Sequence, residues 1–360
     1  MSLTTNTRNF DIMDDRILVF EYFTASGEKD KCIISEAEAL IISLLDDLKN
    51  FNVDLIVNES FEYIAKNYEN VNPILINENV IDYLSKNAKS FNKAVFIAAE
   101  NDNNLYKLTK ILEENNVFIY NSNSIAAFNT SDKFVMHELL EGIVRMPKTS
   151  RIMIDDEEKW KSEVKRFYEI NKKNNFKTIL KPVNGVDCED ILIINDPDDI
   201  EDIFPIDSTV LVQEFIPGED VSVSLIVKDK KAIPISLNKQ YVSVENNKAI
   251  YLGGELPYDT KCKEKAIETA VDACEYLDGL KGFVGVDLRI SSQGDVYLLE
   301  INSRFTTPYV GLQKIANVDL VEYIINSNDQ NMELMEEDIR LSGHVKFKKV
   351  KDHLVIEEFK

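Results

Sequence analysis

The first third of the chain repeats a simple pattern of apolar and polar positions. Between short apolar runs, residues 35–50 and 103–116 place an apolar side chain every three or four positions, as one face of an amphipathic helix does. The apolar runs have the length of buried strands and lie at residues 17–22, 53–57, 94–98 and 117–120. Strands that alternate with helices form parallel sheets covered on both faces, so we predict an α/β domain over residues 16–125.

Beyond residue 177 the pattern changes, because strand-like segments follow one another closely. They lie at residues 178–181, 190–194, 209–215, 221–227 and 233–242. This succession predicts a mixed or antiparallel sheet. Residues 263–277 carry apolar side chains on one face and precede Asp278 and Gly279, which predicts a helix and its end. Residues 345–359 alternate Val and Ile with charges, as a terminal strand or hairpin would.

Composition adds that this is an ordinary folded chain. Of its 360 residues, 44% are hydrophobic and 29% charged, which excludes collagen-like and low-complexity proteins. Residues 1–15 are polar and without a pattern, so we expect a disordered extension there, with Met13 as an alternative start. The longest apolar runs fall far short of the roughly 18 residues of a membrane span, and the expected location is cytoplasmic.

The net charge of the chain limits the classes of partner that we expect. Lys and Arg number 41 against 63 Asp and Glu, a net charge of −22, which opposes attraction to nucleic acid or an anionic membrane. We therefore expect neither a nucleic-acid nor a membrane partner, and the charge leaves a homo-oligomer open. The four cysteines and three histidines form no ligand-spaced cluster, which argues against zinc or thiol-redox sites. No P-loop, dinucleotide-binding, hydrolase-elbow or zincin motif occurs.

Residues 282–304 hold the most informative segment, in which two β-rich runs flank the turn sequence SSQGD. If the turn is centred between Gln293 and Gly294, Asp287 lies opposite Glu300, and Asn302 shares their face because side chains alternate along a strand. Two facing carboxylates repel each other unless a cation lies between them, and Mg²⁺ or Mn²⁺ prefers such oxygen ligands. The alternative is a solvated hairpin whose acids pair with Arg289 and Arg304.

Two lysines, and the end of one strand with the turn that follows it, could bind a phosphate ligand. Lys181 ends an apolar strand before a turn at residues 183–186 that could aim backbone N–H groups at a phosphate, and Lys133 lies near a helix start. Residues 213–220, QEFIPGED, read as a strand exit, a turn and two acids. Taken singly, each lysine could equally face solvent, and the segment could equally be a plain loop between strands.

Taken in order, these pieces resemble the ATP-grasp superfamily over about residues 125–310. The resemblance implies an ATP-grasp fold and an ATP-dependent carboxylate–amine ligase that uses ATP and Mg²⁺ or Mn²⁺, with two ions. By the same resemblance, Lys133 and Lys181 would contact the α- and β-phosphates and Arg304 the transferred phosphoryl group. Adenine would meet Gln213, Glu214 and Ile216, ribose Asp220, and the metals Asp287, Glu300 and Asn302. Catalysis would then rest on Arg304 and Lys181.

Further segments resemble the superfamily's amino-acid ligases, notably residues 19–27, 224–241, 253–255 and 300–307. This resemblance implies an amide between the glutamate side-chain carboxylate and the amine of tyramine, through an acyl phosphate, as in methanofuran biosynthesis. Substrate contacts would come from Ser26, Gly27, Asn238 and Glu255. Another amino-acid pair, such as lysine ligation in pyrrolysine synthesis, and a nucleotide-binding protein without turnover remain alternatives.

The resemblance also divides the chain. We expect a parallel-sheet α/β domain, a small lid subdomain whose loop at residues 184–190 covers the phosphates, and a mixed or antiparallel catalytic subdomain. The expected limits are 1–15 for the extension, 16–125 for the α/β domain, 126–216 for the lid, 217–343 for the catalytic subdomain and 344–360 for a carboxy-terminal tail.

Overall fold

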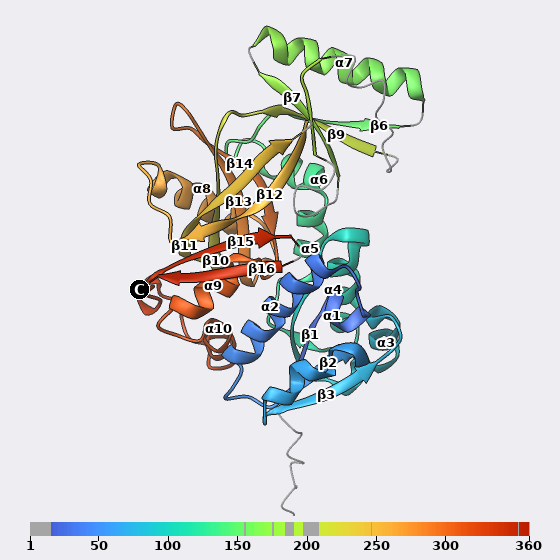
Figure 1. The fold of residues 1–360 in the computed structure, drawn as a ribbon, viewed down its shortest axis with the longest axis vertical. Coiled ribbons are helices and arrows are strands. Elements are labelled where there is room, and N and C mark those ends of the chain that lie inside the picture. The colour runs from blue at the N-terminus through green and yellow to red at the C-terminus, as the bar shows by residue number, and fades with distance from the viewer. Residues whose placement is uncertain are drawn as a thin grey trace, which may run out of the picture.

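The computed structural model describes residues 16–154, 156–174, 176–183, 191–196, 209–245, 247–351 and 353–359. The expected extension at 1–15 and the expected phosphate-covering loop at 184–190 lie outside these residues. Within them the chain forms two sheets (Figure 1), one parallel and one antiparallel. None of the described helices has the length and apolar character needed to cross a membrane.

The amino-terminal sheet is parallel, as the alternating pattern predicted. Its spatial order is β3-β2-β1-β4-β5. The strands are β1 (Ile17–Glu21), β2 (Val53–Asn58), β3 (Val71–Ile76), β4 (Lys93–Ile97) and β5 (Phe118–Ile119). The segments around them are α1 (Tyr22–Ser26), α2 (Lys31–Asp47), η1 (Glu59–Asn67), α3 (Val80–Asn87), η2 (Ala88–Ser90), η3 (Asn101–Asn103) and α4 (Asn104–Glu114).

Helix α2 shows why this sequence folds as it does. Asp30 precedes the helix and accepts hydrogen bonds from the backbone N–H groups of Cys32 and Ile33, which satisfies two donors of the first turn. Its apolar stripe, with Leu44 and Leu45 fully buried, packs on one face of the sheet. Residues of α3 and α4, among them Leu84, Leu108 and Leu112, cover the other face. Helices on both faces keep the all-parallel sheet out of water.

The second sheet has eleven strands, and its described pairings are antiparallel. Its main order is β14-β13-β10-β11-β12-β8-β7-β9-β6, with β15 added to β12 and β16 to β15. The strands are β6 (Thr149–Met153), β7 (Lys177–Pro182), β8 (Leu192–Ile194), β9 (Thr209–Phe215), β10 (Gly218–Lys228), β11 (Lys231–Glu245), β12 (Lys248–Leu256), β13 (Gly282–Ser291), β14 (Val296–Asn302), β15 (His344–Val350) and β16 (His353–Phe359). The predicted antiparallel arrangement is therefore confirmed, as is the terminal hairpin.

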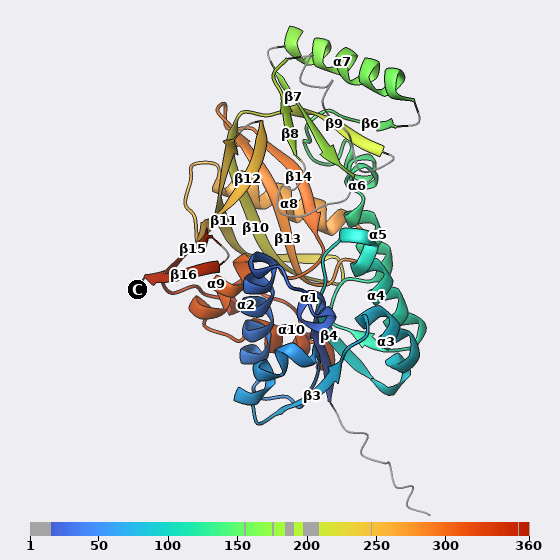
Figure 2. The same cartoon turned by 45° about the vertical axis from the view of Figure 1, so that its right-hand side comes forward.

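Strands β6 to β9 stand apart from the rest of this sheet (Figures 1 and 2). Helix α7 (Glu157–Lys173) packs on them, and Trp160, Val164 and Leu180 lie in their own small core. Strand β8 joins β12 at one registered pair, Lys248 with Leu192, so few cross-strand bonds tie the two parts together. Two short helices, α5 (Ser124–Ser131) and α6 (Lys133–Leu140), precede this unit.

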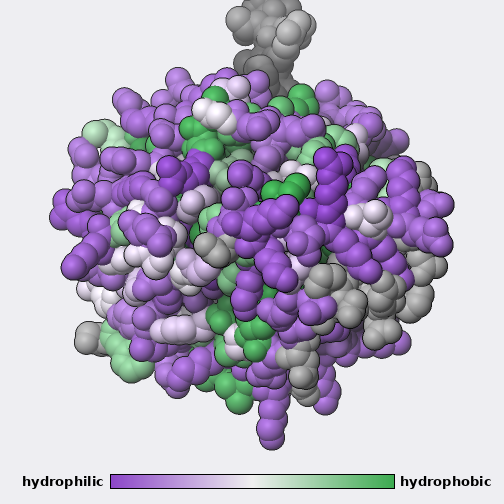
Figure 3. All heavy atoms as spheres, turned by 90° about the horizontal axis from the view of Figure 1, so that it is seen from above, coloured by the Kyte–Doolittle hydropathy of each residue, from purple (hydrophilic) through white to green (hydrophobic). Residues whose placement is uncertain are grey.

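The remaining helices cover the larger sheet. Helix α8 (Lys263–Tyr276) buries Ala266, Ala270 and Cys274 against it. Helices α9 (Pro308–Ile315) and α10 (Leu320–Asp329) share one core with α2, and η5 (Glu336–Asp338) follows them. The face of the molecule in Figure 3 is mostly hydrophilic, with apolar residues only in small groups. The buried hydrophobic residues form cores within and between the two sheets.

Asp47 connects α2 with α9 and α10. Its side chain accepts hydrogen bonds from the Tyr309 hydroxyl (2.9 Å) and the Val321 backbone N–H (3.0 Å). Burial raises the pKa of this carboxyl to about 7, although both hydrogen bonds act in the opposite direction. The folded protein therefore holds the Asp47 proton more tightly than the unfolded chain does.

An Asp47→Asn variant should consequently lose part of the pH dependence of stability. As pH rises through the interval from about 4 to 7, the unfolded chain ionises at Asp47 while the folded protein does not, so wild-type stability falls. Between pH 5.5 and 8 this loss is about 2 kcal/mol, and the Asn variant should not show it. Urea unfolding of both proteins at the two pH values measures the difference; an equal difference at both would contradict the assigned pKa.

Candidate active site

The hairpin of β13 and β14 brings the two predicted carboxylates together. Asp287 lies directly opposite Glu300, as the sequence indicated. The turn is one residue tighter than expected, since Leu288 pairs with Leu298, and a bulge at Leu299 restores the expected register further along. The predicted pairing is thus confirmed, although the uninterrupted ladder assumed for it is wrong.

The bulge also corrects the predicted faces of β14. Regular alternation from Glu300 would place Tyr297 and Leu299 in the apolar layer, whereas Val296 and Leu298 occupy it and are almost fully buried. Leu299 instead lines the pocket beside Glu300. An extra residue in one strand reverses the alternation on one side of it, which explains the exchange.

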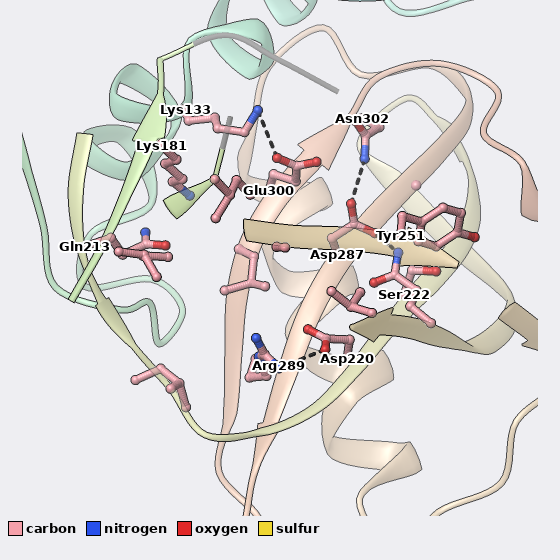
Figure 4. A pocket seen from close by; sticks show the side chains of 18 of the residues that line it. Lys133, Lys181, Gln213, Asp220, Ser222, Tyr251, Asp287, Arg289, Glu300 and Asn302 are labelled. Atoms are coloured by element: carbon pink, nitrogen blue, oxygen red, sulfur yellow. Dashed lines mark hydrogen bonds and ion pairs between the residues drawn. The ribbon is translucent and has the colours of Figure 1, made fainter. Parts of the chain in front are cut away.

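Glu300 lies close to both predicted lysines. Lys133 Nζ is 3.1 Å from Glu300 Oε2, and the charge of Lys181 also acts on this carboxylate. Burial alone would raise the pKa of Glu300, but the two lysines hold it below the ordinary glutamate value. Figure 4 shows Lys133 pointing at Glu300 from one side of the pocket, with Lys181 beside it. Glu300 is therefore a carboxylate, balanced by cations, at neutral pH.

Asp287 has the opposite electrostatic environment. Burial and the neighbouring charge of Glu300 raise the pKa of Asp287 well above its usual range. Gln240 Nε2 donates to its Oδ1 (2.8 Å) and Asn302 Nδ2 donates to its Oδ2 (3.1 Å). A buried carboxylate beside another is costly to ionise without a cation, and two carboxylates with an amide oxygen are a donor set that suits Mg²⁺.

This set is an incomplete coordination sphere on its own. Within the described ranges no three His, Cys, Asp or Glu side chains gather at one point. Mg²⁺ commonly binds through one or two protein carboxylates together with phosphate oxygens and water. The residues present therefore fit a metal held jointly by the protein and a phosphate ligand.

The two lysines reach this point from different elements. Lys181 comes from β7 and is buried, with 6% of its surface exposed. Lys133 is the first residue of α6, where Asp132 caps the helix by accepting from the N–H groups of Phe134 and Val135. The Lys133 N–H also donates to the carbonyl of Val183, at the end of β7. These contacts hold both ammonium groups on one side of the same pocket.

The pocket extends along β9 and β10, where the expected adenine and ribose residues lie. Gln213, Glu214, Ile216 and Asp220 all line it. Gln213 Nε2 donates to Thr149 Oγ1 (2.7 Å), and Asp220 pairs with Arg289 at 2.8 Å. Burial raises the pKa of Asp220, against the lowering effect of Arg289. Apolar side chains of the same lining, such as those of Ile179 and Phe215, could enclose a planar ring.

Arg304 follows β14 and lines the pocket as well. Its guanidinium makes a bidentate pair with Glu100, with Nε and Nη2 each 2.8 to 2.9 Å from the carboxylate oxygens. Glu100 is buried and follows β4 of the parallel sheet. Sequence reasoning did not single out Glu100; its place after the carboxyl end of a predicted strand was the available signal.

The four expected substrate residues do not line this pocket in the described part of the chain. Ser26 and Gly27 end α1, where the buried Ser26 hydroxyl has no hydrogen-bond partner. Asn238 is fully buried and donates to the hydroxyls of Ser222 and Ser224. Glu255 pairs with Lys346 of β15 at 2.8 Å. Their roles as substrate contacts remain predictions.

Similar proteins identify the family to which the chain belongs. An ATP-grasp domain model matches residues 130–308. Tyramine–L-glutamate ligase of Methanocaldococcus fervens is 30% identical over 88% of this chain and 95% of that protein. The corresponding ligase of Methanocaldococcus jannaschii is 31% identical over 88% of this chain and 90% of that protein.

Solved structures agree on the fold. An ATP-grasp superfamily protein from Archaeoglobus fulgidus has a TM-score of 0.69 and 25% identity, covering 96% of this chain and 99% of that one. Biotin carboxylase from Campylobacter jejuni, at 16% identity, shares the fold with a TM-score of 0.72 over 93% of this chain and 75% of that one. The predicted fold class is confirmed, and the chain belongs to the ATP-grasp superfamily of ATP-dependent ligases.

Proposed function

We propose that this protein joins the side-chain carboxylate of glutamate to the amine of tyramine, with conversion of ATP to ADP and phosphate. The observation that carries the proposal is the partly buried pair Asp287 and Glu300, with two lysines and Arg304 lining the same pocket. The similarity to two proteins named tyramine–L-glutamate ligase, over almost their whole lengths, supports the choice of substrates.

The nucleotide would lie between the two strand groups that form the pocket. In this proposal Lys133 and Lys181 contact the α- and β-phosphates, Gln213, Glu214 and Ile216 meet adenine, and Asp220 meets the ribose. Asp287, Glu300 and Asn302 would hold Mg²⁺ or Mn²⁺, with two ions the expectation from the family. A bound divalent ion would neutralise phosphate charge that a protein of net charge −22 otherwise repels.

The reaction needs no protein nucleophile. A substrate carboxylate oxygen attacks the γ-phosphorus of ATP, the bond to the β-phosphate oxygen breaks, and ADP leaves. The amine nitrogen then attacks the acyl phosphate carbon and loses a proton, and phosphate departs with the C–O electron pair. Arg304 would stabilise the negative charge of both steps, so that positioning and electrostatics supply the catalysis. The domain limits expected from the sequence, 16–125, 126–216 and 217–343, are part of this proposal as well.

Release of ADP tests the substrates directly. The enzyme with Mg²⁺ and ATP should release ADP when glutamate and tyramine are both present, and far less with either alone. Mass spectrometry should then detect their amide. Strict dependence on a different pair, such as two lysine-type substrates, would reject the proposed pair while leaving a ligase. ATP binding without ADP release for any acid and amine would reject turnover altogether.

Glu100 gives this proposal a separate prediction. A Glu100→Gln change removes the charged partner that orients Arg304, so kcat should fall about 100-fold while the KM for ATP stays within about twofold. A general loss of structure would change both constants and the melting temperature. Glu114→Gln, an exposed position at the end of α4, is the control. An unchanged kcat for Glu100→Gln would contradict a positioning role.

A further inference from the structure

The pocket has further lining residues that the sequence did not assign. They include Glu36 from α2, Tyr251 from β12, Thr306 and Thr307 between β14 and α9, and Pro308, the first residue of α9. Three parts of the chain that are distant in sequence therefore line one pocket. Arg304 and Thr307 are three residues apart, so their Cα atoms are separated by at most about 11 Å.

Opposite charges meet at Glu36, one of these lining residues. Lys349 of β15 places its ammonium 3.1 Å from Glu36 Oε2, and both side chains are 16% exposed. The Thr307 hydroxyl donates to the other oxygen of Glu36. Lys349 also lies over the Tyr251 ring, 5.5 Å from its centre, where the ring face favours a cation. The terminal hairpin thus brings a cation to a carboxylate that lines the pocket.

We propose that Glu36 and Lys349 bind the amino-acid head group of the carboxylate substrate, its α-ammonium at Glu36 and its α-carboxylate at Lys349. An α-amino acid carries these two charges on one carbon, so it is complementary to a neighbouring carboxylate and ammonium. This inference rests on the proposed function, and it adds the subsite that holds the end of glutamate remote from the reaction.

A bound amino acid can replace the ion pair between Glu36 and Lys349 without leaving either charge exposed to an apolar environment. Breaking a partly buried ion pair by removing one member leaves a charge uncompensated, which is strongly unfavourable. A zwitterion replaces the one pair by two, so neither Glu36 nor Lys349 is left without a counter-charge. A ligand with only one of the two charges would form only one of the two new pairs, which predicts discrimination against it.

The direction of the substrate follows from the same geometry. With its head group at Glu36 and Lys349, glutamate extends its side chain along Thr306 and Thr307 towards Arg304. Gly285 contributes no side chain to the floor there, and a methyl group at this position would come within 2.9 Å of Thr306. The γ-carboxylate, and not the α-carboxylate, therefore faces the phosphate end of the pocket.

Matched substrates and variants test the assignment of each charge. Amide formation with tyramine is measured for glutamate, for glutarate, which lacks the ammonium, and for 4-aminobutyrate, which lacks the α-carboxylate. Glu36→Gln should lower kcat/KM for glutamate about 10- to 100-fold and leave the lower value for glutarate nearly unchanged. Lys349→Met should likewise lower kcat/KM for glutamate about 10- to 100-fold and leave the lower value for 4-aminobutyrate nearly unchanged.

Controls separate this role from a structural one. Glu38→Gln on α2 and Lys348→Met, whose partner is Glu357 on the same hairpin, should behave like wild type. The KM for ATP should not change in any variant. Equal losses for all three acids, or no loss for glutamate, would overturn the inference.

The proposed function can fail separately. If wild-type enzyme makes no amide from glutamate and tyramine, the proposed substrates are wrong, and calorimetry with a panel of α-amino acids and Mg²⁺–ATP then decides the inference. Tighter binding of some member to wild type than to Glu36→Gln would support the subsite. Equal binding by both proteins across the panel would overturn it.

Discussion

Glu300→Gln should lower the rate of ADP release about 1000-fold while the protein remains folded. Glu300 lies between Asp287 and Lys133, where the metal and the phosphates would meet, and the change removes its negative charge. The loss of the ion pair with Lys133 lowers the melting temperature, but the repulsion between the two carboxylates also disappears, so the protein should stay folded. Steady-state kinetics with the proposed substrates and the melting temperature measure both effects.

A matched change tests whether position matters. Glu268→Gln lies on the exposed side of α8, has the same chemistry and should keep full activity. Added Mg²⁺ should not restore Glu300→Gln, because the missing ligand belongs to the protein. Turnover within tenfold of wild type would exclude Glu300 from the metal and phosphate end of the site.

Lys181→Met is the second change with a large expected effect. Its ammonium is buried in the pocket and acts on Glu300, so the change removes a cation that would contact the phosphates. We expect kcat/KM for ATP to fall at least about 100-fold, since Met keeps the length and apolar stem of Lys without its charge. Binding of a fluorescent ATP analogue and kinetics at varied ATP concentration measure it.

Lys177→Met provides the control on the same strand. Lys177 is exposed at the other end of β7, so its charge is screened by water and its loss should not alter the KM for ATP. If Lys177→Met and Lys181→Met reduce activity equally, a general effect of charge on β7 would explain both, and the phosphate contact would be refuted.

Periodicity predicted those elements whose apolar positions are clear. The strands that became β1, β2, β4 and β9 are within one or two residues of their expected limits, as is helix α8. Each buries an uninterrupted apolar run or one regular stripe, and such patterns survive any tertiary context. The facing of Asp287 and Glu300 was predicted in the same way, from a turn sequence and strand alternation.

Other features depend on contacts that no local pattern records. The bulge at Leu299 keeps the expected pair but exchanges which neighbours are buried, and a single extra residue leaves no mark in the composition. Glu100 and Glu36 approach the pocket only because the parallel sheet and α2 pack beside β14 and the following loop. Acidic residues on loops and helices are usually solvated, so Glu36 carried no local signal, and the only signal for Glu100 was its place after a predicted strand.

The placement of Glu36 and Lys349 has an evolutionary consequence. The residues expected to handle the nucleotide belong to the stretch shared across the superfamily, whereas these two lie outside it, one on each side. If the proposed subsite is correct, mutations at Glu36 and Lys349 can accumulate without changing the residues expected to contact the phosphates. Substrate preference would then change through mutations in α2 and the terminal hairpin alone. Paralogues with nearly identical nucleotide-binding residues would still form different amides.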